Sequence, residues 1–235
     1  MEQFLRTQML IGGEGLERLQ QSKVMIFGVG GVGSFTVEAL ARAGVGSLVL
    51  VDFDIVDVTN INRQLSALHS TIGKYKVEIL QERIHDINPQ AKVITYKEKV
   101  SGENVREFFS ENPSYVVDAI DMISSKLAII KTALQLRVPI ISAMGAGNRL
   151  DPSKLKLGVL SETAGSGCSL ARVMRRESKK EGINQEVSVV YSTEQITSCS
   201  TNNSTSRTLG SISFVPSVAG LFLAAKVVND LLKPT

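Results

Sequence analysis

The chain of 235 residues has little of what a metal-stapled or disulfide-bonded fold requires. Its two cysteines, Cys168 and Cys199, form no paired C-x-x-C motif, so a structural zinc site and a disulfide framework both lack ligands. Residues 1–23 are polar and amphipathic, without the apolar core of a secretory signal. We therefore expect a protein of a reducing compartment, located in the cytoplasm.

The chain also lacks a strong net charge and a long hydrophobic run. Its formal charge of +3 is too small to indicate nucleic-acid binding without local clustering of basic residues. The longest apolar stretch, residues 212–228, contains Pro216 and Lys226 and falls short of the ~20 residues that a membrane-spanning helix needs. We expect a buried helix there and no stable membrane span; weak association with a membrane is the alternative.

A glycine-rich turn between two apolar runs is the most informative feature that is present. Gly28, Gly30 and Gly33 have the G-x-G-x-x-G spacing, which allows a tight turn, close approach of a phosphate and close helix packing. Asp52 and Asp54 follow at about 20 residues' distance, where a carboxylate can bind ribose hydroxyls. The pattern predicts nucleotide binding. In the milder alternatives the turn serves packing alone, and Asp54 only caps its loop.

Apolar runs typical of strands alternate with helical patterns along the chain. This alternation predicts an α/β fold, a Rossmann-like, doubly wound and mostly parallel sheet with a C-terminal appendage, and ligands at the carboxyl ends of the strands. The expected strands are 24–27, 47–51, 92–96, 115–117 and 139–142, and the expected helices are 33–43, 74–87, 104–109 and 124–136.

The character of the sequence divides it into three predicted regions. These are an N-terminal helical arm (1–21) with a break at Gly12 and Gly13, a nucleotide-binding Rossmann-like domain (22–150), and a C-terminal region for substrate binding and packing (151–235). Within the last region we expect strands at 155–160 and 187–191, a basic helix at 169–181, a polar, solvated stretch at 197–208 and a final helix at 215–232.

Charged residues beyond the glycine turn indicate which nucleotide is bound. Asn60 and Arg63 follow the ribose acids, Lys76 begins the next helical pattern, and Asp118 and Asp121 end the fourth strand. A nicotinamide site needs an apolar pocket, whereas a triphosphate needs cations and a carboxylate for Mg²⁺. We therefore predict ATP and Mg²⁺ as cofactors. Singly, each of these residues could also be a surface charge or a helix cap.

The ordered motifs GVGGVG, LVDFD, TNINRQ, GKYK and DAID, over residues 6–150, resemble the ubiquitin-activating-type adenylyltransferases, which also activate sulfur carriers in thiamine and molybdopterin pathways. The resemblance implies ATP binding and a homodimer, in which an arginine reaches across to the partner's ATP. By resemblance, the phosphates lie against Gly31 and Asp52 binds the ribose. The residues that bind the triphosphate are Asn60, Arg63 and Lys76. Asp121 holds Mg²⁺, and the arginine that reaches across is Arg6.

The reaction of that family is attack of a carboxylate on the α-phosphate of ATP, which releases pyrophosphate and leaves an acyl adenylate. The difficulty is that an anion attacks an anion, so Arg6, Arg63 and Lys76 would neutralise both reactants and stabilise the transition state. With Asp121 as the metal ligand, these form the expected catalytic set. No side chain is needed as a nucleophile, because the substrate carboxylate attacks directly.

Further motifs bear on which carboxylate is activated. Family members that act on ubiquitin-like proteins usually carry two C-x-x-C motifs, which are absent here. The segments AMGAGNRLDPSKLKLGVL, SLARVMRRESKKEGI, VVYSTE and GSISFVPSVAGL resemble the tRNA-modifying dehydratases of the family. This implies a tRNA carrying threonylcarbamoyladenosine beside its anticodon: ATP activates the threonyl carboxylate, and the carbamoyl group closes a ring with net loss of water.

Three alternatives remain open at this point. The chain could adenylate the C-terminus of a ubiquitin-like sulfur-carrier protein, with that carrier or a cysteine desulfurase as partner. It could be an NAD-dependent oxidoreductase, because the glycine turn and Asp52 alone would suit one. It could also be a noncatalytic nucleotide sensor.

The basic helix predicted at 169–181 offers a separate argument for RNA. Leu170, Val173 and Met174 form an inward face, and a basic stripe suited to phosphates covers the rest: Arg172, Arg175, Arg176, Lys179 and Lys180. A plain solvated face is the alternative, because Glu177 and Glu181 dilute the charge.

One position in this region departs from the resemblance. A proline is expected before the LA of the basic helix, where this chain has Ser169. The neighbouring Cys168 would lie at a helix N-terminus, which can lower a thiol pKa and make it an acyl acceptor. We interpret it instead as a small packing residue, because ring closure within the substrate requires no covalent enzyme step.

Overall fold

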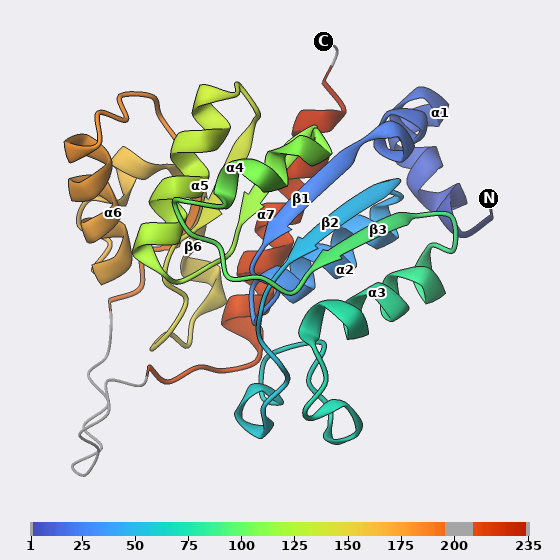
Figure 1. Cartoon of the computed structure of the whole chain (residues 1–235), viewed down its shortest axis with the longest axis horizontal. Helices are drawn as coiled ribbons and strands as arrows, with labels where there is room; N and C mark the ends of the chain where they lie inside the picture. Colours follow the sequence, from blue (N-terminus) through green and yellow to red (C-terminus); the bar gives the residue numbers. More distant parts are fainter. Residues whose placement is uncertain (1, 196–208, 234–235) are drawn as a thin grey trace.

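The computed structural model describes residues 2–195 and 209–233. Within these residues seven strands form one sheet in the order β3-β2-β1-β4-β5-β7-β6 (Figure 1). The strands are β1 (Lys23–Phe27), β2 (Ser47–Val51), β3 (Lys92–Tyr96), β4 (Tyr115–Asp118), β5 (Ile140–Ala143), β6 (Leu155–Val159) and β7 (Ser188–Ser192). The helices are α1 (Leu5–Gln21), α2 (Gly33–Ala43), α3 (Lys76–Ile87), α4 (Val105–Phe108), α5 (Ile123–Gln135), α6 (Ser169–Lys180) and α7 (Phe214–Leu231).

The sheet is doubly wound, as predicted. From β1 the chain adds β2 and β3 on one side and then β4, β5 and β7 on the other, all in parallel, while β6 pairs antiparallel with β7 at the edge. The winding reverses between β1 and β4, and a crevice for ligands is expected beyond the carboxyl ends of the strands at such a point. Strands β6 and β7 extend this sheet, so the chain after residue 150 continues the same layered architecture.

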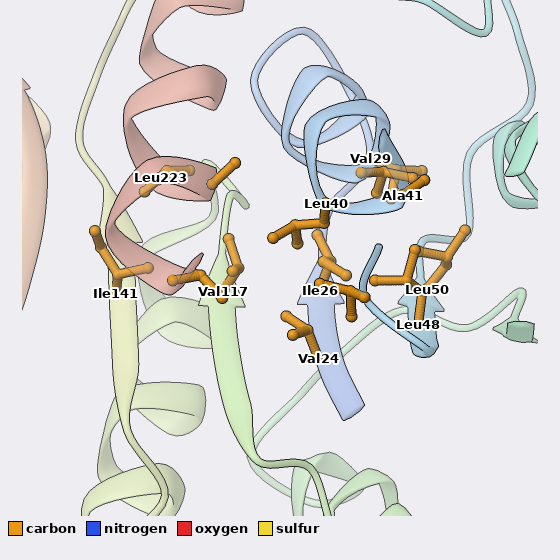
Figure 2. Packing of buried hydrophobic residues seen from close by; sticks show 14 of the residues in the cluster. Val24, Ile26, Val29, Leu40, Ala41, Leu48, Leu50, Val117, Ile141 and Leu223 are labelled. Atoms are coloured by element: carbon orange, nitrogen blue, oxygen red, sulfur yellow. The ribbon is translucent and has the colours of Figure 1, made fainter. Parts of the chain in front are cut away.

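Alternating residues of the strands build two hydrophobic layers. In β1, Val24 and Ile26 belong to the cluster under α2, α3 and α7, while Met25 and Phe27 belong to the cluster under α4, α5 and α6. The period of two follows from the strand, whose side chains point alternately to opposite faces. Figure 2 shows side chains of the first cluster meeting between strands and helices, among them Leu40 of α2. Burying one such leucine fully contributes about 1.5–3 kcal/mol.

The helix boundaries have local causes that the sequence predicts. Helix α2 ends at Gly44, whose φ of 97° places it in the left-handed region that glycine adopts without strain. The N-terminal arm is kinked at Gly12, which has a φ of 76° and interrupts the helix at the predicted break. All predicted strands and longer helices occur within a residue or two of their expected bounds, with α2, β2 and β3 at those bounds.

Helix α7 closes the fold across the first hydrophobic layer. Its length and composition would allow it to cross a membrane. One face, however, is part of the core: Val215, Leu223 and Val227 are fully buried and join the cluster that contains α2. Thr36 of α2 donates a hydrogen bond to the backbone oxygen of Gly220 at 3.0 Å. The expectation of a buried helix at this position is confirmed.

Candidate active site

A cavity of about 630 Å³ lies where the carboxyl ends of β1, β2, β4 and β5 meet. The loops that follow these four strands line it, as the topology of the sheet requires. Of the residues predicted to bind or activate the nucleotide, all but Arg6 and Gly33 lie on its wall: Gly28, Gly30, Gly31, Asp52, Asp54, Asn60, Arg63, Lys76 and Asp121.

The glycine turn depends on the absence of side chains. Gly28 has a φ of 83°, and a Cβ built there would lie 2.9 Å from the backbone oxygen of Ala119. Gly33 lies behind the cavity wall, where a Cβ would come within 1.9 Å of the Gly28 backbone oxygen. Gly33 thus lets α2 begin against the turn, while Gly30 and Gly31 face the cavity. The turn therefore presents backbone, rather than side chains, to a ligand at the start of α2.

Asp52 is held in place by backbone amides. Its Oδ2 accepts a hydrogen bond from the Val29 amide at 2.8 Å, and its Oδ1 accepts one from the Asp54 amide at 2.9 Å. Burial raises the pKa of the Asp52 carboxyl, although these amide hydrogen bonds oppose the shift. The carboxylate is therefore fixed at the end of β2, where it can accept hydrogen bonds from ribose hydroxyls.

Lys76 and Asp54 form an ion pair at the cavity wall. Lys76 Nζ lies 2.6 Å from Asp54 Oδ2, with 5% of the lysine side chain exposed against 47% for the aspartate. The Lys76 amide also donates to the Asp54 backbone oxygen at 3.1 Å. Asp54 therefore positions the ammonium at the start of α3, where a nearly buried cation can attract a phosphate strongly.

Arg63 is anchored beside the glycine turn. Its Nη1 donates to the Thr59 backbone oxygen at 2.9 Å and to Asn62 Oδ1 at 2.8 Å. Its Cγ would lie 3.3 Å from a Cβ built on Gly31, so a side chain there would press on the arginine. Asn60, which begins this turn, accepts a hydrogen bond from the Asp57 amide at 3.2 Å and shapes the loop. The guanidinium thus lies next to the predicted phosphate site.

The two aspartates after β4 have different environments. Asp118 is fully buried and forms an ion pair of 2.8 Å with the equally buried Lys126, and it accepts a hydrogen bond of 2.6 Å from Ser142. Asp121 is exposed on the cavity wall and makes no hydrogen bond or ion pair with the part of the chain that is described. Asp118 therefore has a structural role, whereas the Asp121 carboxylate is available to a ligand.

The Asp121 carboxylate fits the predicted Mg²⁺. Hard oxygen ligands suit this ion, which usually binds one or two carboxylates together with phosphate oxygens. Among residues 2–195 and 209–233, no group of three or more His, Cys, Asp or Glu side chains forms a metal site made by the protein alone. Any Mg²⁺ here would therefore depend on the nucleotide for most of its ligands.

Arg6 lies far from this cavity in its own chain. It is exposed on α1, which packs at the opposite end of the sheet, where its last turn meets the start of β2 (Figure 1). Buried Phe4 and Leu19 anchor the arm, whereas Met9 and Leu10 are 76% and 86% exposed. Arg6 could act on a nucleotide only in another copy of the chain.

Helix α6 carries the predicted basic stripe. Arg172, Lys179 and Lys180 are exposed, whereas Arg175 is half-buried and donates a hydrogen bond to Thr163 Oγ1. Arg176 is exposed but lies 2.6 Å from Glu177, which also pairs with Lys180 at 3.1 Å. The acidic side chain therefore neutralises part of the stripe, as the composition suggested.

Cys168 caps this helix from within the cavity wall. It is 5% exposed, and its Sγ accepts a hydrogen bond from the Ala171 amide at 3.4 Å. This contact and the burial are those of a packing residue at a helix start. Cys199 and the predicted polar stretch 197–208 lie outside the described residues.

The cavity has a second side that sequence reasoning did not identify. Three segments distant in the chain form it: residues 143–147 and 149, residues 168–170 and residues 209–211. Asn148 joins two of them, because its amide donates to the Gly210 backbone oxygen and its Oδ1 accepts from the Gly210 amide, at 2.8 and 2.6 Å. Arg149 lies on this side, within the quoted motif AMGAGNRLDP, and no spacing or periodicity marked it.

Comparisons with known proteins agree with this architecture. The tRNA threonylcarbamoyladenosine dehydratase of Bacillus subtilis is 43% identical over 99% of this chain and 96% of its own length. That of Haemophilus influenzae is 36% identical over 94% of this chain and 89% of its own length. The crystal structure of the Escherichia coli enzyme in complex with ATP superposes with a TM-score of 0.91, at 31% identity, covering 98% of this chain and 94% of that one. The ThiF family profile matches residues 4–234, and the chain therefore belongs to the ThiF family.

Proposed function

We propose that the protein is an ATP-dependent dehydratase that cyclises the threonylcarbamoyl side chain of the modified adenosine beside the anticodon of tRNA. One observation carries the proposal: the glycine turn, a ribose acid and two cations meet in one cavity of a chain whose relatives over almost the full length are named for this activity. Because tRNA is its proposed substrate, we propose that the protein acts in the cytoplasm.

The proposed reaction has two steps. An oxygen of the threonyl carboxylate attacks the α-phosphorus of ATP, and the bond to pyrophosphate breaks. The carbamoyl group then attacks the acyl carbon, loses a proton and displaces AMP, which keeps the carboxylate oxygen. The ring thus forms with loss of the elements of water, at the expense of one ATP.

The described residues have distinct roles in the first step. Asp52 orients the ribose, and Gly30 and Gly31, which line the cavity without side chains, leave room for the phosphates at the start of α2. Arg63 and Lys76 offset the repulsion between carboxylate and triphosphate and stabilise the charge that develops in the transition state. Mg²⁺, held by Asp121 and phosphate oxygens, would supply further charge neutralisation.

Two surfaces support the larger assembly. The exposed apolar residues Leu5, Met9 and Leu10 of the arm suit packing against a second copy, which would bring Arg6 to the ATP of the partner. The exposed bases of α6, with Arg172 and Lys179 unpaired among the described residues, suit the phosphates of tRNA. Affinity for tRNA should therefore fall as salt is raised.

The direct test is AMP formation from ATP with purified tRNA that carries threonylcarbamoyladenosine, compared with the same tRNA without the modification. We expect AMP and the cyclised nucleoside only with the modified tRNA. Lys76→Ala should lower the rate about 10²–10³-fold, as the removal of one transition-state charge partner does elsewhere. Lys74→Ala, which changes an exposed lysine outside the cavity, is the matched control. AMP formation that ignores modified tRNA and requires a sulfur-carrier protein would contradict the proposal.

A further inference from the structure

Arg149 is a buried cation on the cavity wall, and most of its hydrogen-bond donors have no partner among the described residues. The residue is 3% exposed. Its Nη1 donates to the backbone oxygen of Glu194, whereas its Nε and Nη2 are buried and have no hydrogen-bond partner among the described residues. A buried charged group without its hydrogen bonds is costly, so native proteins rarely keep one without a reason.

The surrounding chain holds the guanidinium in this state. Asn148 has a φ of 55°, and its two hydrogen bonds with Gly210 fix the turn that precedes Arg149. The Glu194 carboxylate accepts hydrogen bonds from the amides of Leu150 and Asp151, both at 2.9 Å, and forms no ion pair with the arginine. Only the backbone oxygen of Glu194 contacts the guanidinium.

Four other carboxylates line the cavity, and among the described residues none of them forms an ion pair with Arg149: Asp52, Asp54, Glu98 and Asp121. Asp54 pairs with Lys76, and both oxygens of Asp52 accept backbone amides. Asp121 follows β4 and forms no ion pair with Arg149. Nε and Nη2 form one edge of the guanidinium, and this edge matches the two oxygens of a carboxylate. The missing counter-charge therefore has the shape of a planar, two-oxygen anion.

We propose that Arg149 binds the carboxylate of the acid that becomes adenylated, through its Nε and Nη2, and so aims that acid at the nucleotide. The inference rests on the proposed function and names the residue that recognises its substrate. A nucleotide phosphate fits this arginine less well. Arg63, beside the glycine turn, and Lys76, at the start of α3, both follow β2. Arg149 follows β5, and β1 and β4 lie between these two strands.

The test measures three affinities and one rate in the full-length protein. The variants are Arg149→Gln, Arg149→Lys, which keeps the charge but loses the two-pronged edge, and Arg106→Gln, an exposed arginine on α4, as the matched control. Circular dichroism and thermal unfolding establish that each is folded. Binding is measured for ATP alone, for unmodified tRNA and for tRNA carrying threonylcarbamoyladenosine, and AMP formation is followed with the modified tRNA.

We expect Arg149→Gln to raise the KM for modified tRNA about 10- to 100-fold, the loss of hydrogen bonds to a charged group. The preference for modified over unmodified tRNA should vanish, while binding of ATP and of unmodified tRNA stays unchanged. Arg149→Lys should have a KM for modified tRNA between that of the wild type and that of Arg149→Gln.

Four results would overturn the inference, and the last of them would overturn the proposed function as well. Equal loss of ATP affinity would assign Arg149 to the nucleotide phosphates, and equal loss for unmodified tRNA would assign it to the tRNA backbone. If Arg149→Gln has an unchanged KM for modified tRNA and forms AMP at the wild-type rate, the role of Arg149 is refuted while the proposed function stands. If the wild type itself forms no AMP with modified tRNA, the proposed function fails, and this inference fails with it.

Discussion

The buried ion pair between Asp118 and Lys126 should be one of the strongest single determinants of stability. Both side chains are fully buried. Replacing Lys126 with methionine leaves the Asp118 carboxylate in the core, with hydrogen bonds from Ser142 at 2.6 Å and from the Ile120 amide at 3.2 Å as its remaining donors. Removing one partner of a buried pair costs about 3–5 kcal/mol, a large part of the ~5–15 kcal/mol that holds a protein folded.

The magnitude can be measured by urea unfolding followed by far-ultraviolet circular dichroism. With a denaturant slope of about 2–3 kcal/mol/M, Lys126→Met should lower the midpoint by roughly 1–2.5 M. The double variant Asp118→Asn/Lys126→Met should recover much of this loss, because no charge is left uncompensated. Lys131→Met is the matched control on the same helix, since Lys131 pairs with Glu181 in the open, with 45% and 49% of the side chains exposed.

The control should cost less than about 1 kcal/mol, as exposed pairs do. If Lys126→Met falls within about 1 kcal/mol of this control, the argument from buried charge is wrong. The pair also affects the site, because Lys126 donates to the Ile120 backbone oxygen at 2.9 Å and so holds the segment that leads to Asp121. Loss of the lysine should therefore lower turnover as well as stability.

Three further predictions concern the nucleotide site. Gly33→Ala should abolish ATP binding or unfold the turn, because its Cβ would lie 1.9 Å from a backbone oxygen. In the control Gly102→Ala the new Cβ would have no atom within 4 Å, so calorimetric titration should give the wild-type affinity for ATP. Burial raises the pKa of Asp52 above 3.8, so ATP affinity should fall as pH drops through that pKa, and Asp52→Asn should lose this pH dependence. The free energy of unfolding should change in the opposite direction. It should decrease as pH rises through the same pKa, because the native state holds the proton more tightly than the unfolded chain. Mixing inactive Arg6→Ala with inactive Lys76→Ala should restore activity if the arm crosses between subunits, and an inactive mixture would exclude that geometry.

Much of the fold could be predicted because its signals are local. The turn at Gly28 needs a positive φ value that glycine adopts freely, and the G-x-G-x-x-G spacing marks it in the sequence. The helical pattern of residues 33–43 likewise ends where the structure ends α2. Strand alternation assigns Ile26 and Phe27 to opposite layers without further information. The order of strands beyond β5 could not be predicted, because the pairing of β7 with β5 depends on contacts between residues almost fifty positions apart.

Charge partners are less accessible to sequence reasoning, because a partner is chosen by the fold. Asp118 and Asp121 are equal candidates in the motif DAID, yet the first is sealed against Lys126 and the second is open to the cavity. Only tertiary structure shows that Asp54 is the residue that holds Lys76. A carboxylate in a motif therefore indicates where a site lies, and burial decides which carboxylate can serve a ligand.

The two sides of the cavity differ in how far apart their residues lie in the sequence. The nucleotide side is drawn from residues 28–76 and the short segment after β4, so its motifs stand close together in the chain. The second side joins residues 143–147 and 149, residues 168–170 and residues 209–211, and only the folded chain shows that most donors of Arg149 have no partner among the described residues. A buried cation without a partner cannot be inferred from a sequence, because only the folded structure shows which acidic and carbonyl groups lie within reach of it.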